Sequence, residues 1–105
     1  MSVAKILIVE DESIIALDIQ TSLQTAGYDV VGIATCAEEA IAEVTRSQPD
    51  LVLMDIRLRG VMDGVATAEQ IRREFFLPVI YLTAHADENT LSRAKLTQPF
   101  GYVLK

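Results

Sequence analysis

The chain has 105 residues, the size of one compact domain, and half of them are hydrophobic, which is enough to form a core. Its formal net charge of -6 argues against nucleic acid or an anionic membrane as a direct partner, because both attract clustered lysine and arginine. No apolar run reaches the roughly 20 residues of a membrane span, and the start of the chain does not resemble a signal peptide. The single cysteine, Cys36, excludes a disulfide within the chain, which fits a reducing compartment. We therefore expect a cytoplasmic protein.

Five short apolar runs rich in branched residues predict strands. They are continuous rather than alternating, which is typical of strands buried on both faces of a sheet. In chain order they are residues 6–9, 30–33, 51–54, 79–82 and 102–104.

Longer stretches with apolar residues at helical spacing separate these runs. Their apolar stripes are Ile15-Ile19-Leu23, Ala37-Ala40-Ile41-Val44, Val65-Ala68-Ile71-Phe75 and, more weakly, Leu91-Ala94. Gly27 or a proline ends each stretch. Of the neighbouring aromatic residues, Phe75 is expected in the core and Phe76 at the surface, and Cys36 is interpreted as a small apolar filler.

Strict alternation of strands and helices predicts an α/β fold with a doubly wound parallel sheet, and residues 1–105 are expected to form one domain. The fifth strand ends at Lys105, so the closing helix that usually covers one face of such a sheet is absent from this chain. We therefore expect exposed apolar surface on the sheet, with formation of a homodimer as one consequence.

Acidic and polar residues follow the predicted strands where each strand ends. Glu10 and Asp11 follow the first strand, Asp55 the third, Thr83 ends the fourth and Lys105 the fifth. Ligands of open parallel sheets bind at the carboxyl ends of the strands, so these side chains are expected to meet. Clustered carboxylates suit Mg²⁺, and a carboxylate can act as the nucleophile that forms an aspartyl phosphate. Taken singly, each residue also has a structural explanation, such as Asp11 as a helix cap.

The same segments resemble the receiver domains of response regulators in two-component signalling. The resemblance runs along the whole chain and is carried by an ordered set of motifs, ILIVEDE at 6–12, LVLMD at 51–55, PVIYLTA at 78–84 and GYVLK at 101–105. It implies a flavodoxin-like fold with strand order 2-1-3-4-5. It also implies a phosphorelay function that is not that of an enzyme, although the domain would catalyse its own phosphorylation and dephosphorylation.

By this resemblance, Asp55 accepts the phosphoryl group from a histidine kinase or a phosphotransfer protein. Asp11 and Asp55 would bind Mg²⁺, Glu10 would act through water, and the backbone carbonyl of Arg57 would supply another ligand.

The remaining implied roles concern the response to phosphorylation. Thr83 would hydrogen-bond the phosphoryl group, Lys105 would pair with it, and Tyr102 would turn inward as an aromatic switch when Thr83 moves. The output domain is not named by the sequence.

The chain departs from the commonest receiver pattern in the loop after Asp55. Arg59 stands where many receivers carry proline, and the loop to Gly64 is one residue longer than usual. This version resembles receivers of multidomain sensor proteins. His85 and Arg57 are weaker candidates for tuning dephosphorylation.

Three other functions are conceivable for the same pattern of residues. A magnesium-dependent phosphatase with an aspartyl nucleophile usually carries a second acid where Arg57 stands, so Arg57 argues against this function. Flavin binding would need a phosphate-cradling loop after the first strand, and the sequence lacks one. A docking or dimerisation module that works without phosphorylation remains the alternative on the same fold.

Overall fold

The computed structural model describes residues 3–55, 64–83 and 101–104. Within them, five parallel strands form one sheet in the order β2-β1-β3-β4-β5, as predicted. The strands are β1 (Lys5–Val9), β2 (Asp29–Ala34), β3 (Leu51–Asp55), β4 (Val79–Thr83) and β5 (Gly101–Leu104), and the helices are α1 (Ser13–Thr25), α2 (Ala37–Ser47) and α3 (Gly64–Phe75). No helix of the described ranges is both long enough and apolar enough to cross a bilayer.

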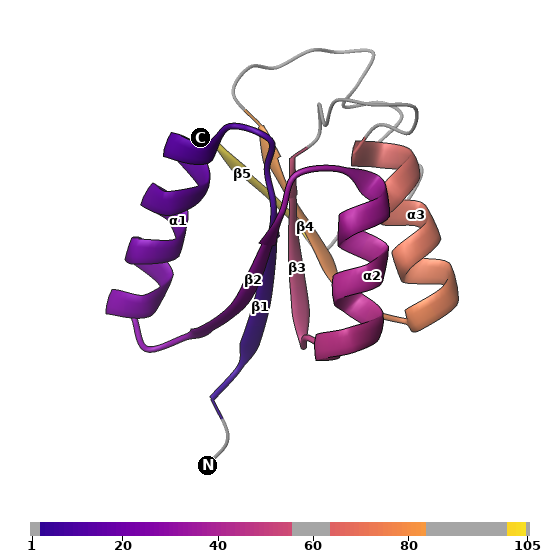
Figure 1. Cartoon of the computed structure of the whole chain (residues 1–105), viewed down its shortest axis with the longest axis horizontal. Helices are drawn as coiled ribbons and strands as arrows, with labels where there is room; N and C mark the ends of the chain where they lie inside the picture. Colours follow the sequence, from indigo (N-terminus) through magenta and orange to yellow (C-terminus); the bar gives the residue numbers. More distant parts are fainter. Residues whose placement is uncertain (1–2, 56–63, 84–100, 105) are drawn as a thin grey trace.

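The three helices lie on opposite faces of the sheet. Helix α1 lies on one face, and α2 and α3 lie together on the other (Figure 1). Successive strand residues point to opposite faces, so each apolar run supplies both layers. The core on the α2 and α3 side is formed mainly by Leu7, Val9, Val52, Met54, Val79 and Tyr81 with Val44, Ala68 and Ile71 of the helices.

The core on the α1 side is smaller. Its buried members are Ile6, Leu53 and Leu82, with Ile19, Leu23, Leu51 and Ile80 only partly buried against them. The sequence predicted that Ile15, Ile19 and Leu23 form the buried stripe of the first helix, but the one fully buried residue of α1 is Ala16. The stripe is less buried than predicted because α1 packs mainly on β1 and β2 at one side of the sheet.

Strand β2 also differs from the prediction of a strand buried on both faces. It is an edge strand, and most of its residues are only partly buried. A bulge at Val31 interrupts its pairing with β1, because Ile6 pairs with Val30 and Leu7 with Gly32. Bulges of this kind twist an edge strand and discourage pairing with another chain.

The helices α1, α2 and α3 end within three residues of Gly27, Pro49 and Pro78, where the sequence predicted their ends. Gln48 adopts a left-handed conformation after α2, and the αL residue Phe76 after α3 is 87% exposed, as expected for a surface residue. Cys36, interpreted from the sequence as a small apolar filler, is half-buried and occupies the N-cap position of α2. The predicted fourth helix lies outside the described residues.

Candidate functional site

Glu10 and Asp55 are neighbours because of the register of two adjacent strands. Val9 of β1 is paired with Met54 of β3, and the residues that follow these two are Glu10 and Asp55. Side chains alternate between the two faces of a sheet, so Glu10 continues the face of Ile8 and Asp55 continues the face of Leu53. Asp55 is the last residue of β3 and lies opposite Leu82 of β4, so it stands between the carboxyl ends of two neighbouring strands.

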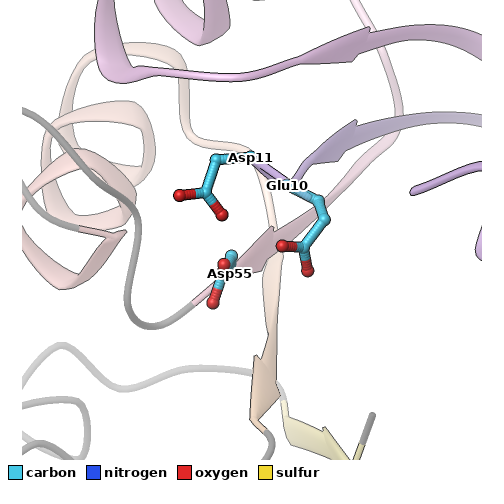
Figure 2. Close-up of side chains that lie close together, drawn as sticks. All are labelled: Glu10, Asp11 and Asp55. Atoms are coloured by element: carbon cyan, nitrogen blue, oxygen red, sulfur yellow. The ribbon is translucent and has the colours of Figure 1, made fainter. Parts of the chain in front are cut away.

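Asp11 completes a group of three carboxylates at this end of the sheet. One carboxylate oxygen from each of Glu10, Asp11 and Asp55 can be chosen so that all three lie within 4.8 Å of one another. Figure 2 shows the three side chains gathered at the ends of β1 and β3. Glu10 is fully buried, Asp55 is 2% exposed, and Asp11 is partly buried, so the site opens toward solvent at Asp11.

The proximity of three acids has an electrostatic cost. At an effective dielectric constant of about 20, two like unit charges separated by about 4 to 5 Å repel by about 3 to 4 kcal/mol. A divalent cation removes this repulsion, and carboxylate oxygens with water are the ligands that Mg²⁺ prefers. The donor set therefore fits a hard divalent cation, which Glu10, Asp11 and Asp55 would hold directly or through water.

Backbone hydrogen bonds hold the segment that carries Glu10. The Glu10 N–H donates to the Ala34 carbonyl at 2.9 Å, which extends the pairing of β1 with β2 by one residue. The Glu12 N–H donates to Glu10 Oε1 at 3.3 Å. Glu12 is also the N-cap residue of α1, and its carbonyl accepts from the Ala16 N–H, so the turn after Glu10 leads straight into the helix. Glu12, and not Asp11, is therefore the N-cap residue of α1, and Asp11 belongs to the acidic group.

Glu39 stabilises the connection between β2 and α2. Glu39 Oε1 accepts from the Thr35 N–H at 2.7 Å and from the Thr35 hydroxyl at 2.5 Å. These bonds join the residue after β2 to the first turn of α2, beside the Ala34 carbonyl that holds Glu10. The Thr35 hydroxyl and N–H lower the pKa of Glu39. Sequence reasoning missed this pair, although an acid in the first turn of a helix is a known capping signal.

The described residues cover the predicted site in part. Thr83 ends β4 and Tyr102 lies in β5, where its backbone pairs with Tyr81. Their side chains, and the whole of Arg57, His85 and Lys105, lie outside what the structure describes, as do Arg59 and the loop before Gly64.

The comparison with protein families decides the class of this domain. The model of the response regulator receiver domain family matches residues 6–105. The chain belongs to this family. As a receiver domain it is a module of two-component signal transduction, as the motifs at the strand ends predicted.

The relatives of this receiver domain include longer regulators. It is 33% identical to the transcriptional regulatory protein PdtaR of Mycobacterium tuberculosis over 96% of this chain and 49% of that protein. It also resembles the Bacillus subtilis regulatory protein PhoP for alkaline phosphatase synthesis, with 36% identity over 80% of this chain and 35% of the relative. The receiver domain thus spans about half or less of the length of these relatives.

Among solved structures, it is similar to the signal receiver domain of a modulated diguanylate cyclase from Desulfovibrio desulfuricans. The TM-score is 0.94 at 39% identity, over 99% of this chain and 82% of the other. A similar match is the N-terminal domain of a response regulator/sensory box/GGDEF three-domain protein from Carboxydothermus hydrogenoformans, with TM-score 0.85 and 42% identity over 95% and 80% of the chains. The predicted likeness to receivers of multidomain proteins is confirmed.

Proposed function

We propose that Asp55 is the phosphoacceptor of this receiver domain and that Glu10, Asp11 and Asp55 hold the Mg²⁺ ion that the reaction needs. The observation that carries the proposal is the convergence of the three carboxylates at the carboxyl ends of β1 and β3. The family of the chain supports the same reading, since receivers act in two-component signalling.

In the proposed reaction, a carboxylate oxygen of Asp55 attacks the phosphorus of a phosphohistidine on a histidine kinase or phosphotransfer protein. A P–O bond forms to Asp55, the P–N bond breaks, and the imidazole nitrogen keeps the electron pair. Bound Mg²⁺ would neutralise charge on the phosphoryl oxygens. Because Asp55 is almost fully buried, the site limits the approach of water to the aspartyl phosphate.

The roles of Thr83, Lys105 and Tyr102 are proposals of the same kind. Thr83 would donate a hydrogen bond from its hydroxyl to the phosphoryl group, and Lys105 would pair with that group. Tyr102 would be the aromatic switch that turns inward as Thr83 moves. Register supports a part of this scheme, since the backbone of Thr83 lies one residue beyond the level of Asp55. The carbonyl of Arg57 as a further magnesium ligand rests on the family resemblance.

The wider setting is proposed from the same family. Residues 1–105 would act as one receiver unit in the cytoplasm that catalyses its own phosphorylation and dephosphorylation and passes the change to an output domain. A docking module that needs no phosphorylation is disfavoured, because the acidic group is intact.

The test is intact-mass analysis of the chain after incubation with an acyl phosphate and Mg²⁺. The wild type should gain one phosphoryl group, and Asp55→Asn should gain none. Asp29→Asn is the matched control, because Asp29 is an exposed acid at the opposite end of the sheet, and it should be labelled like wild type. Labelling of Asp55→Asn at the wild-type level would reject the assignment.

A further inference from the structure

The peptide group between Ala34 and Thr35 makes a hydrogen bond at each of its two edges. Its carbonyl belongs to Ala34 and accepts from the Glu10 N–H at 2.9 Å. Its N–H belongs to Thr35 and donates to Glu39 Oε1 at 2.7 Å. The peptide bond is trans, so the group is planar and its C=O and N–H point in opposite directions. Glu10 and Glu39 are therefore bonded to opposite edges of one rigid unit.

The sheet holds this peptide group from one side. Ala34 is the last residue of β2, which is an edge strand whose neighbour in the described sheet is β1. Because the Ala34 carbonyl points toward β1, the Thr35 N–H points outward, beyond the edge of that sheet. The acceptor there is Glu39, in the first turn of α2, and the Thr35 hydroxyl donates to the same oxygen at 2.5 Å. Glu39 thus fixes the side of the peptide group that strand pairing leaves open.

The orientation of this peptide group bears on the acidic group through Glu10. The Glu10 side chain is fully buried, and its carboxylate lies in the cluster of three acids. A side chain in a close-packed interior has few alternative positions, so the direction of its carboxylate follows the backbone from which it departs. The N–H of that backbone is held by the Ala34 carbonyl. Donation to a carboxylate on the far edge also polarises the peptide group, which strengthens the bond that its carbonyl accepts.

We propose that Glu39 is a positioning residue for the magnesium site. Through the Ala34–Thr35 peptide group, it fixes the Glu10 backbone and thereby the direction in which the Glu10 carboxylate meets the ion. This inference rests on the proposed function, in which Glu10 belongs to the group of acids that holds Mg²⁺. Glu39 is exposed and lies outside that group, so it acts on the ion through Glu10 and not as a ligand.

A capping role alone would explain why an acid stands in the first turn of α2, but it would not link that acid to Mg²⁺. Glu38 offers the comparison. It is an exposed acid of the same turn, and the hydrogen bonds that lower its pKa come from its own N–H and from Cys36. Removing Glu38 or Glu39 takes the same charge from the same turn, whereas the Glu39 change alone releases Thr35.

Calorimetric titration of the 105-residue chain with Mg²⁺ tests the proposal. Glu39→Ala should weaken binding about three- to tenfold, which is less than the roughly 10- to 100-fold loss caused by removing a group bonded directly to a metal ligand. Glu39→Gln should stay within about twofold of wild type, because its amide oxygen can still accept from Thr35. Glu38→Ala should also stay within about twofold, since the bonds between Thr35 and Glu39 remain.

Amide hydrogen exchange followed by NMR measures the positioning without the ion. In a chelator, the Glu10 amide of Glu39→Ala should exchange about threefold or more faster than in wild type, relative to the amides in the middle of β1. A general loss of stability would speed all of these amides alike, so the ratio separates positioning from capping. Glu39→Gln and Glu38→Ala should leave the ratio unchanged.

The outcomes separate this inference from the proposed function. A wild type that binds no Mg²⁺ rejects the magnesium site itself, and with it the role of Glu39. Normal binding by wild type together with unchanged binding by Glu39→Ala overturns the positioning role alone. So does an equal loss in Glu38→Ala, which would assign the effect to charge, or a Glu10 amide whose relative exchange is the same in all four proteins.

Discussion

Glu10 and Asp55 lie at the same level of two hydrogen-bonded strands, one residue beyond the pairing of Val9 with Met54. Neither residue is near the other in the chain, and neither is more than 2% exposed. Two carboxylates held at this separation repel each other, and a divalent cation between them offsets the repulsion. The consequences of this repulsion can be measured directly.

Neutralising one acid should stabilise the chain when no metal is present. We expect Asp55→Asn in EDTA to raise the free energy of unfolding by about 1 to 2 kcal/mol, because it removes two repulsive interactions with neighbouring acids. Urea unfolding with a chelator measures the difference. Asp29→Asn, at the exposed start of β2, should change it by less than about 0.5 kcal/mol. A less stable Asp55→Asn would mean that hydrogen bonding to the charged form outweighs the repulsion.

Mg²⁺ should bind the wild type and shift its unfolding midpoint upward. We expect Asp11→Asn to weaken Mg²⁺ about tenfold or more, since it removes a charged oxygen ligand from the acidic group. Calorimetric titration gives the affinity. Glu12→Gln is the neighbouring control, because the Glu12 side chain is exposed and stands outside the group. Equal losses in both variants would show that general negative charge, and no defined site, attracts the ion.

The Thr35–Glu39 contact should make a small part of the stability depend on pH. The Thr35 hydroxyl and N–H lower the pKa of Glu39 in the folded chain, so the contribution is present above the ordinary glutamate pKa and is lost as pH falls through the lowered value. NMR titration should find the pKa of Glu39 below its usual range. Thr35→Val removes the hydroxyl donor, which is the larger cause, and should move that pKa back upward. An unchanged pKa in Thr35→Val would assign the effect to the backbone donor alone.

Gly32 makes room for an acid of α2 at the bulged edge of the sheet. A Cβ at Gly32 would lie 2.9 Å from Glu43 Oε1, the atom that accepts from the Ser47 hydroxyl at 2.8 Å and pairs with Arg46. Gly32→Ala should therefore cost about 1 kcal/mol by displacing this carboxylate.

In a Glu43→Ala background the sign should reverse. The same Gly32→Ala change should then be neutral or stabilising by about 0.5 to 1 kcal/mol, because alanine loses less backbone entropy than glycine on folding. Chemical unfolding of the four proteins in this cycle measures the coupling. Additive effects would show that the cost at Gly32 does not come from Glu43.

The secondary-structure elements and the type of sheet could be predicted from the local pattern of residues. Continuous branched apolar runs and helical stripes placed the described strands and helices within a few residues, because burial of those faces is the main source of their stability. Alternation of the two patterns predicted a parallel sheet, and the ordered motifs predicted the family. The acids at the strand ends followed from the general place of ligand sites in such sheets.

Tertiary structure decided the features that depend on how elements meet. The one-residue bulge at Val31 and the pairing of Val9 with Met54 set which acids share a level, and no local preference encodes a register between distant strands. The position of α1 over β1 and β2 left its expected core stripe half-buried. Residue types and their spacing thus determine the elements and the candidate chemistry, whereas the distances between the carboxylates depend on packing across the whole sheet.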